Sequence, residues 1–369
     1  MSSILVRSLA EPYTWAWRGR SPSQVFSSDA EEKGRQMMQL RDDVNRQAKL
    51  PTTEEESIAF VDDLCLRYRN WGRWGADDQR GTLNFITPEA LIFAATLIQS
   101  GRVVSCGLPF DSDGPQSGGF GGRTNPVHWM LQDGGDIALG AQDNIALLRY
   151  TDDAVSMPLQ CGTQWDALAH IFYRGKMYNG HGLERVTSAG ATINSIDQIA
   201  DGVVGRGVLL DIPRHRGVRW LEAGESIDDV ELAECAAAQG VEIRSGDIVL
   251  VRTGQIAQVR STGSWGQYDS GPAPGLGAAA AHWFASNEIS ALATDTWGAE
   301  VLPNDIPGVF QPLHLILLVN AGMTIGEIFD LEGLSAACRD EGRYDFFFTA
   351  PPLPIAGAVG SPINPLAIF

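Results

Sequence analysis

Eleven consecutive residues near the middle of the chain gather side chains that could do chemistry. They read QCGTQWDALAH and hold two carboxamides (Gln160 and Gln164), one carboxylate (Asp166) and one imidazole (His170). If a helix begins at the Gly-Thr pair, Asp166 and His170 are four residues apart and share one face of it. Polar groups among apolar neighbours are costly to bury unless they bind something. Two interpretations remain: a buried polar network that caps a helix, or one wall of a chemical site.

Two further side chains could react on their own. Cys161 lies inside the same stretch, as a nucleophile or as a small buried hydrophobic residue. His128 precedes Trp129 and Met130, which predicts either a core histidine or one that lines a pocket. The chain has five cysteines and no CxxC, so a disulfide framework and a zinc finger are both unexpected. Reduced thiols fit a cytoplasmic protein.

Strands that alternate with helices must position these residues, which predicts an α/β fold. One strand, Val155–Leu159, leads into the reactive stretch, and the long Gly-rich loop 111–126 precedes His128. Further strands are expected at 101–108, 144–150, 207–212, 247–253, 289–295, 325–330 and 346–349. Helices are expected at 52–70, 87–99, 228–239 and 274–285, while the apolar run 313–319 suits either a helix or a strand. We expect residues 71–369 to form one domain, preceded by an N-terminal helical extension, 1–70, in which residues 29–49 read as a surface helix or a mobile arm.

Bulk properties exclude several classes of protein. The 369 residues carry a net charge of −18, which makes nucleic acid an unexpected partner. A hydrophobic content of 44% supports a sizeable core and argues against long disorder. Because the longest apolar runs are short, we expect no membrane span and no membrane partner. The N-terminus lacks an apolar stretch followed by a cleavage site, which again favours the cytoplasm.

The reactive stretch resembles the motif of the cyclase-like metal-dependent hydrolases, a family that includes kynurenine formamidase, isatin hydrolase and trans-dienelactone hydrolase. Their pattern His-x-Gly-Thr-His-x-Asp-x-Pro-x-His corresponds here to Gln160-x-Gly-Thr-Gln164-x-Asp166-x-Leu168-x-His170. Further matches follow in the family's order, from an entry signature at 74–84 through Arg252-Thr253-Gly254, Pro274-Gly275-Leu276, Asp295 and His314 to Glu327. The resemblance spans roughly residues 70–365 and indicates a longer subgroup.

The resemblance implies a fold, an assembly and a site. The fold is a swivelling β/β/α domain, and the assembly is a homodimer or homotetramer. The site holds one or two divalent metals, and metal-activated water attacks a carbonyl group. The implied metal ligands are Gln160, Gln164, Asp166, His314 and Glu327. His170 takes the family's acid/base position.

The chain departs from the family at two of these ligands, since Gln160 and Gln164 replace histidines. A carboxamide oxygen is a neutral, hard and weak ligand that suits Ca²⁺, Mg²⁺ or Mn²⁺ better than Zn²⁺. Both replacements keep a donor atom, which favours a variant that retains a metal over a metal-free pocket. We therefore expect a divalent metal cofactor, manganese or zinc.

Three functions remain open. The leading hypothesis is a metal-dependent hydrolase that opens a cyclic ester or amide, or cleaves an amide such as an arylformamide, with His170 as acid/base. The second is a metal-free acid/base enzyme that performs a cyclisation, dehydration or isomerisation. The third is a catalytically dead ligand-binding or scaffold protein. A small cyclic or aromatic substrate is expected because aromatic residues flank the motifs; the candidate pocket residues are Trp74, Phe120, His128, Trp129, Tyr173 and Tyr178.

Overall fold

The computed structural model describes residues 50–369, which form one compact unit. The helix or arm predicted at 29–49 lies outside the described residues. The domain boundary predicted after residue 70 falls within the compact unit, because α2 (Glu54–Arg67) packs into its core through Val61, Leu64 and Cys65. In this described part of the chain, no helix has the length and apolar character that a bilayer crossing requires.

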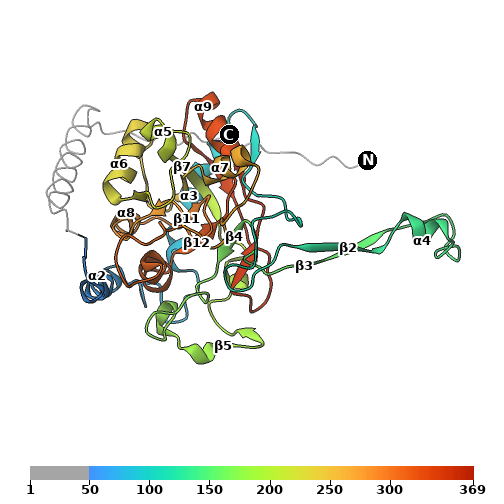
Figure 1. Cartoon of the computed structure of the whole chain (residues 1–369), viewed down its shortest axis with the longest axis horizontal. Coiled ribbons are helices and arrows are strands. Elements are labelled where there is room, and N and C mark those ends of the chain that lie inside the picture. Colours follow the sequence, from blue (N-terminus) through green and yellow to red (C-terminus); the bar gives the residue numbers. More distant parts are fainter. Residues whose placement is uncertain (1–49) are drawn as a thin grey trace, which may run out of the picture. The chain divides into compact units, whose positions relative to one another are not determined.

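A nine-stranded sheet organises the unit (Figure 1). Four parallel strands form its centre: β7 (Val204–Asp211), β9 (Ile248–Arg252), β11 (Ala291–Thr294) and β12 (Thr324–Glu327). Antiparallel strands extend it on both sides, in the order β1–β15–β13 beside β7 and β4–β14 beside β12. Their bounds are β1 Val103–Ser105, β15 Leu366–Ile368, β13 Asp345–Thr349, β4 Gln164–Asp166 and β14 Gly360–Pro362.

Both faces of the central strands are covered. Alternate side chains of a strand point to opposite faces, so Val208 and Leu210 join one core while Leu209 joins the other. On the first face lie α6 (Asp229–Ala238), α8 (Ala280–Ser286) and a π-helix, His314–Ala321. On the second face lies α9 (Glu332–Glu341). Buried on both faces, these strands read as continuous apolar runs, which is why the sequence reveals them.

Shorter elements complete the unit. The helices are α3 Pro88–Ala95, α4 Gly134–Ala138, α5 Ile212–Arg216 and α7 Gln255–Thr262, with 3₁₀ turns at Gly81–Phe85, Tyr178–Gly180, Leu183–Arg185 and Ile196–Ile199. The small strand pairs are β2 Val127–Gln132 with β3 Asp152–Ser156, β5 Val186–Thr187 with β6 Gly190–Ala191, and β8 Ser226–Ile227 with β10 Gly275–Leu276.

Most predicted elements are confirmed, and four need correction. No helix follows the Gly-Thr pair; Gln164–Asp166 is instead β4, held between β12 and β14. The strand expected at 144–150 is a series of turns, and the helix expected at 274–285 begins only at Ala280, after β10. Residues 157–159 extend beyond β3 without strand pairing. For β4 and β10, pairing with strands distant in sequence, which local sequence does not report, decides the conformation.

One hairpin stands apart from the sheet. Residues 127–156, called the arm below, comprise β2, α4 at the tip and β3, and Figure 1 shows them extending away from the rest of the compact unit. The arm forms a two-stranded sheet of its own, with Val127 paired to Ser156 at its base. It connects the Gly-rich loop at one end to the reactive stretch at the other.

Candidate functional site

Three side chains from separate elements converge beside the antiparallel strand pair β4–β12, in which Glu327 lies opposite Gln164. Asp166 ends β4, Glu327 ends the antiparallel β12, and His314 begins the π-helix. One ligand atom from each lies within 4.8 Å of the others. The His314 Nε2 atom is 3.4 Å from Glu327 Oε1 and 3.8 Å from Asp166 Oδ2. All three side chains are at most 5% exposed, so they form a buried cluster of nitrogen and oxygen donors.

Glu300 orients the imidazole of His314 from behind. Its Oε1 atom lies 2.7 Å from His314 Nδ1 and accepts the backbone N–H of His314 at 2.9 Å, while Oε2 accepts the N–H of Leu313. The carboxylate therefore caps the first turn of the π-helix and directs Nε2 toward Asp166 and Glu327. A carboxylate on the far nitrogen of a metal-binding histidine is a common support for such ligands. Sequence reasoning missed Glu300, because nothing local marks an acid 14 residues before a histidine.

Gln164 is also part of the cluster, and its amide is turned in a definite direction. Its Nε2 donates to Glu327 Oε2 at 2.8 Å, which leaves Oε1 as a buried acceptor without a partner among the described residues. Asp166 Oδ1 is equally buried and unpaired there. Since a buried oxygen without a partner is unfavourable, two such atoms beside the cluster indicate that something binds them.

The other predicted ligand, Gln160, lies against Gly360, the residue of β14 that pairs with Asp166. Its buried Nε2 has no hydrogen-bond partner in the part of the chain that the structure describes, and it lies against Gly360 of β14. A Cβ at Gly360 would come within 2.5 Å of this nitrogen. Among residues 50–369 this nitrogen forms no hydrogen bond with the Asp166 cluster, so the role of Gln160 as a ligand stays a prediction.

His170 borders the cluster from the turn after β4. Its Nε2 lies 3.8 Å from Asp166 Oδ1, and its side chain is 20% exposed. The predicted proximity of the two residues is confirmed, although a turn closed by the His170 N–H on the Ala167 carbonyl produces it rather than a helix. Burial lowers the pKa of His170 to about 4, so its imidazole is neutral at pH 7 and can accept a proton.

The buried carboxylates of the cluster and its surroundings outnumber the positive charge that His314 can provide, which favours binding of a cation. Burial, followed by the nearby charge of Glu327, raises the pKa of Asp166 well above its ordinary value. Burial alone would lower the pKa of His314, but Glu300 and Glu327 outweigh it and raise that pKa to about 10. Three buried carboxylates thus face one imidazole. Together with the unpaired Gln164 oxygen, this donor set fits a divalent metal ion that prefers oxygen and nitrogen ligands.

The rest of the reactive stretch holds the cluster in place. The Thr163 hydroxyl donates to the Ile328 carbonyl at 2.6 Å and accepts the Leu108 N–H, so it ties strands together instead of capping a helix. The indole of Trp165 is fully buried and donates to the Ala350 carbonyl. Burial raises the pKa of Cys161 to about 11, which keeps it a thiol at pH 7 and favours its interpretation as a buried hydrophobic residue.

The Gly-rich loop brings a positive charge to the site. Gln116 donates to the Cys161 carbonyl at 3.0 Å, and Ser117 binds Asp269, so the loop is fastened at its first half. Farther along, the Arg123 guanidinium lies over the ring of Phe120, which packs against Trp297. The pKa of Asp166 is raised by burial and then by Glu327, and His314 and Arg123 oppose this rise; the pKa of His170 is lowered by burial, which Glu327 opposes and to which Arg123 adds. Phe120, one of the predicted pocket residues, therefore lies on a loop close to the site.

The remaining predicted pocket residues are engaged elsewhere. Tyr173 donates to Asp62 of α2, and the buried Tyr178 donates to Asp78. Trp74 packs edge-on against the ring of Phe85. These three aromatic residues anchor loops to the body of the protein.

His128 and Trp129 lie on the arm, where both are exposed; the core interpretation of His128 is therefore wrong, while the pocket role of the two residues stays a prediction. The His128 side chain is 55% exposed and its Nε2 lies 2.7 Å from Asp153 on β3. Trp129 is 44% exposed. Their apolar neighbours in the sequence suggested burial, but these neighbours, such as Met130 and Leu131, are also exposed on the hairpin.

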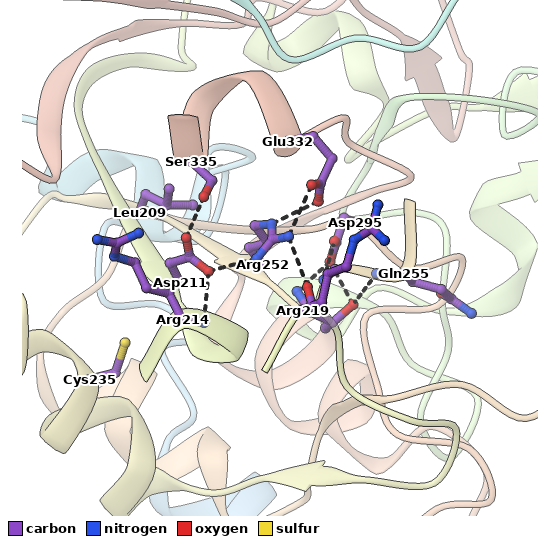
Figure 2. Close-up of polar contacts among 12 residues, drawn as sticks. Leu209, Asp211, Arg214, Arg219, Cys235, Arg252, Gln255, Asp295, Glu332 and Ser335 are labelled. Atoms are coloured by element: carbon purple, nitrogen blue, oxygen red, sulfur yellow. Dashed lines mark hydrogen bonds and ion pairs between the residues drawn. The ribbon is translucent and has the colours of Figure 1, made fainter. Parts of the chain in front are cut away.

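A second polar network braces the ends of the parallel strands. Figure 2 shows Arg252, at the end of β9, between Asp211 at the end of β7 and Glu332 on α9. Next to it, Asp295 accepts hydrogen bonds from the backbone and hydroxyl of Thr253 and from the backbone of Gly254. The predicted strand-end acid Asp295 is thus fully engaged with the Thr-Gly turn. These contacts assign the Arg252–Gly254 motif a structural role.

The nine-stranded sheet and its covering helices form an α/β fold that is shared with the cyclases. The family described as "Putative cyclase" matches residues 82–301, more than half of the chain. A crystal structure of a novel cyclase is 37% identical, with the match covering 83% of this chain and 99% of the other at a TM-score of 0.74. The chain therefore belongs to the cyclase family.

More distant structures share the fold. Isatin hydrolase A from Ralstonia solanacearum is 20% identical, and the match covers 77% of this chain and 98% of that one at a TM-score of 0.55. An isatin hydrolase bound to the product analogue thioisatinate is 16% identical, with coverages of 77% and 99% and the same TM-score. A search of curated proteins found no match.

Proposed function

We propose that this protein is a divalent-metal-dependent hydrolase that acts on a cyclic amide or ester, or on an amide. The observation that carries the proposal is the buried cluster of Asp166, His314 and Glu327, whose ligand atoms lie within 4.8 Å of one another. The unpaired Oε1 of Gln164 adds a fourth donor. Isatin, after which two structures of the same fold are named, is an aromatic cyclic amide, which supports a substrate of that class.

The residues divide the work of hydrolysis among them. A divalent cation held by Asp166, His314 and Glu327 would supply carbonyl polarisation and acidification of water. His170, neutral at pH 7, takes a proton from the attacking water at Nε2. It then gives this proton to the nitrogen or oxygen that leaves as the carbon–nitrogen or carbon–oxygen bond breaks, and the acyl group ends as a carboxylate. Asp166 Oδ1, 3.8 Å away, stabilises the imidazolium between these two transfers.

Hydrogen bonds from neighbouring side chains hold Glu327 and His314 in fixed orientations. Gln164 holds the Glu327 carboxylate through its Nε2, and Glu300 fixes the ring of His314. The guanidinium of Arg123, which lies over Phe120 on the Gly-rich loop, would attract an anionic product or substrate. Such preorganised groups contribute to rate because they need no rearrangement during the reaction.

Metal analysis and a substrate panel test the proposal. Purified full-length protein is analysed for bound metals, then assayed with isatin, N-formylaniline and an aryl lactone, before and after EDTA and after readdition of Mn²⁺ or Zn²⁺. We expect a stoichiometric divalent metal and turnover that EDTA abolishes and metal restores. Turnover that survives in metal-free protein would instead support acid/base catalysis without a metal. Binding of panel compounds without turnover would support a ligand-binding protein.

A variant separates the role of His170 from that of the ligands. His170→Ala is expected to retain the metal and to lose about 10²–10⁴-fold in kcat, the usual contribution of a general acid/base. Asp166→Asn is expected to lose the metal. Equal turnover of wild type and His170→Ala on a confirmed substrate would remove the assigned role of His170.

A further inference from the structure

The Gly-rich loop contacts both sides of the candidate site. In its first half, Gln116 donates to the carbonyl of Cys161, within the reactive stretch. Farther along, the ring centroid of Phe120 lies 5.1 Å from that of Trp297, on the segment that leads to Glu300 and the π-helix. The loop therefore joins the two chain segments that carry the residues of the buried cluster.

The loop is fastened along its length. The side-chain amide of Asn125 donates to carbonyl groups of the loop itself, and Asp269 accepts the N–H groups of Ser117 and Gly119 from outside. A Cβ on residue 119 would lie 2.3 Å from the hydroxyl oxygen of Ser270, so glycine permits this close approach. Side chains that such a loop carries are held in place before a ligand arrives.

A glycine turn within the loop pairs an aromatic ring with a positive charge. Gly121 and Gly122 both have positive φ, 61° and 68°, as the central residues of a type I′ turn require. The Arg123 N–H closes the turn on the Phe120 carbonyl at 3.2 Å. The Arg123 guanidinium then lies over the Phe120 ring, 5.2 Å from its centroid. The order Phe-Gly-Gly-Arg thus encodes a ring and a cation that are held together.

Arg123 is a half-buried cation without an acidic partner. Among residues 50–369 its guanidinium forms neither an ion pair nor a hydrogen bond, although acidic residues outnumber basic ones 45 to 27 in the whole chain. Behind burial and Glu327, its charge also acts on the pKa values of Asp166 and His170, so the cation lies within electrostatic reach of the cluster. An unpaired guanidinium at this place is free to bind an anion.

We propose that Arg123 determines the specificity of the site and selects substrates that carry a carboxylate in addition to the amide or ester bond that is cleaved. The guanidinium presents a planar fork of N–H donors that matches a carboxylate, and the ring of Phe120 holds this fork in place. The acids of the cluster and the net charge of −18 repel such a substrate, so a local cation is needed to admit it. This inference rests on the proposed function, because it names the class of substrate for the same site.

The rings near Arg123 indicate what the rest of the substrate resembles. The ring centroid of Phe310 lies 6.3 Å from that of Phe120, and the Phe310 side chain is 54% exposed, whereas Trp297 is buried. An exposed phenyl ring beside a buried indole forms an apolar edge against which a flat ring can pack. The substrate class is therefore a cyclic or aromatic amide or ester whose ring bears a carboxylate.

Hydrolysis itself is the other source of a carboxylate, since it converts the acyl group into one. If Arg123 served only this product group, it would assist charged and neutral substrates equally. If it recognises a carboxylate that the substrate brings, its loss affects charged substrates selectively. Matched pairs of substrates distinguish the two sources.

Steady-state kinetics on the full-length protein test the proposal with two such pairs, isatin and isatin carboxylated on its benzene ring, and N-formylaniline and para-formamidobenzoate. The wild type is expected to prefer the charged member of a pair. Arg123→Gln is expected to lower this preference in kcat/KM by about 10–100-fold, the effect of losing a hydrogen bond between charged groups. The loss should appear in KM more than in kcat, because the recognised group does not react. Arg123→Lys keeps the charge without the fork and should retain part of the preference.

Arg219→Gln is the matched control. Arg219 is exposed and also lies over an aromatic ring, 5.0 Å from the centroid of Trp220, but it borders the strand-end network of Figure 2. Its variant should keep the preference of the wild type. A wild type that does not favour charged substrates would overturn the proposal. So would an Arg123→Gln variant that loses charged and neutral turnover equally, which would assign Arg123 to the product carboxylate.

A binding measurement separates this proposal from the proposed function, because it needs neither metal nor turnover. EDTA-treated protein is titrated calorimetrically with benzoate and with benzamide, a neutral compound of similar shape. Benzoate is expected to bind the wild type at least about tenfold more tightly than benzamide, a difference that Arg123→Gln removes and Arg219→Gln retains. Absence of turnover together with this difference would contradict the proposed hydrolysis and leave carboxylate recognition by Arg123 in place. Equal binding of the two compounds by the wild type would overturn the role of Arg123.

Discussion

Among single residues, Glu300 controls how His314 faces the cluster. We predict that Glu300→Gln weakens Mn²⁺ binding about 10–100-fold, the range found when a partner of a metal-binding histidine is changed. The amide can still accept one N–H, but it no longer supplies the charge that holds the ring of His314. Isothermal titration with Mn²⁺ measures the effect, and Glu288→Gln, at the exposed ion pair with Arg73, is the control. Unchanged affinity would show that Glu300 serves only to cap the helix.

Gln164 is expected to influence which metal ion the cluster prefers. We predict that Gln164→His raises the affinity for Zn²⁺ at least tenfold over the wild type, because imidazole is a stronger ligand for Zn²⁺ than a carboxamide oxygen. The unpaired Oε1 of Gln164 is the atom that the imidazole would replace. Competition with a fluorescent zinc chelator measures the affinity. Gln198→His adds an exposed histidine as a control, and an equal gain there would show that any new histidine suffices.

The sequence predicted part of this cluster, for a definite reason. Asp166, His314 and Glu327 were identifiable because their residue types and their order in the chain match a family pattern. Glu300 was not, since its contacts with the π-helix arise only in the folded chain. His128 was misplaced because an exposed apolar hairpin has the same local composition as a core strand.

Among the elements, α2 supports the π-helix, and the capping box at the start of α2 makes this support testable. Cys65 and Arg69, in and just beyond α2, contact Leu315 and Asn320 of the π-helix that begins with His314. Glu56 closes the other end of α2 by accepting the N–H groups of Thr52 and Thr53. These hydrogen bonds, with Thr52 the largest contributor, lower the pKa of Glu56 below its ordinary value of 4.5.

We predict that Glu56→Gln destabilises the protein at pH 7 and that this difference disappears in acid. Because the folded-state pKa of Glu56 is depressed, its stabilisation is present above about pH 4.5 and is lost as the pH falls through the folded pKa. Urea unfolding of wild type and variant at pH 7 and at roughly pH 2, below the depressed folded-state pKa, measures the difference in free energy. Glu184→Gln, on an exposed 3₁₀ turn away from α2, is the comparison. A difference that does not depend on pH would exclude the carboxylate as its source.

The sequence revealed the central strands better than the segments around the site. Fully buried parallel strands such as β7 and β9 are continuous apolar runs in the sequence. The start of α6 is predictable because Asp228 is a typical N-cap residue. By contrast, β4 is three residues long and exists because β12 and β14 pair with it from both sides. The run after Leu313 has no period that distinguishes a strand from a helix, and Glu300 on its first N–H groups helps to select the helix.

For the molecule as a whole, the proposed metal centre would place two buried acids side by side, which lowers stability in return for the ability to bind a cation. Without a cation, Asp166 and Glu327 are desolvated like charges close to His314, which lowers the free energy of unfolding. A bound cation removes this penalty and adds RT ln(1 + [metal]/Kd), about 2.7 kcal/mol at a hundredfold excess over Kd. The same cluster should therefore weaken the metal-free protein and strengthen the loaded one.

This exchange predicts opposite responses in one variant. With EDTA at pH 8, Asp166→Asn should unfold at a higher temperature than the wild type, because it removes one buried charge and keeps nearly the same shape. With excess Mn²⁺ the order should reverse, since only the wild type gains the binding energy, which is equivalent to several degrees in Tm for a chain of this size. Differential scanning calorimetry measures both, and Asp201→Asn at an exposed ion pair should follow the wild type. If Asp166→Asn were the less stable protein in EDTA, Asp166 would be a structural hydrogen-bonding residue whose charge the fold already accommodates.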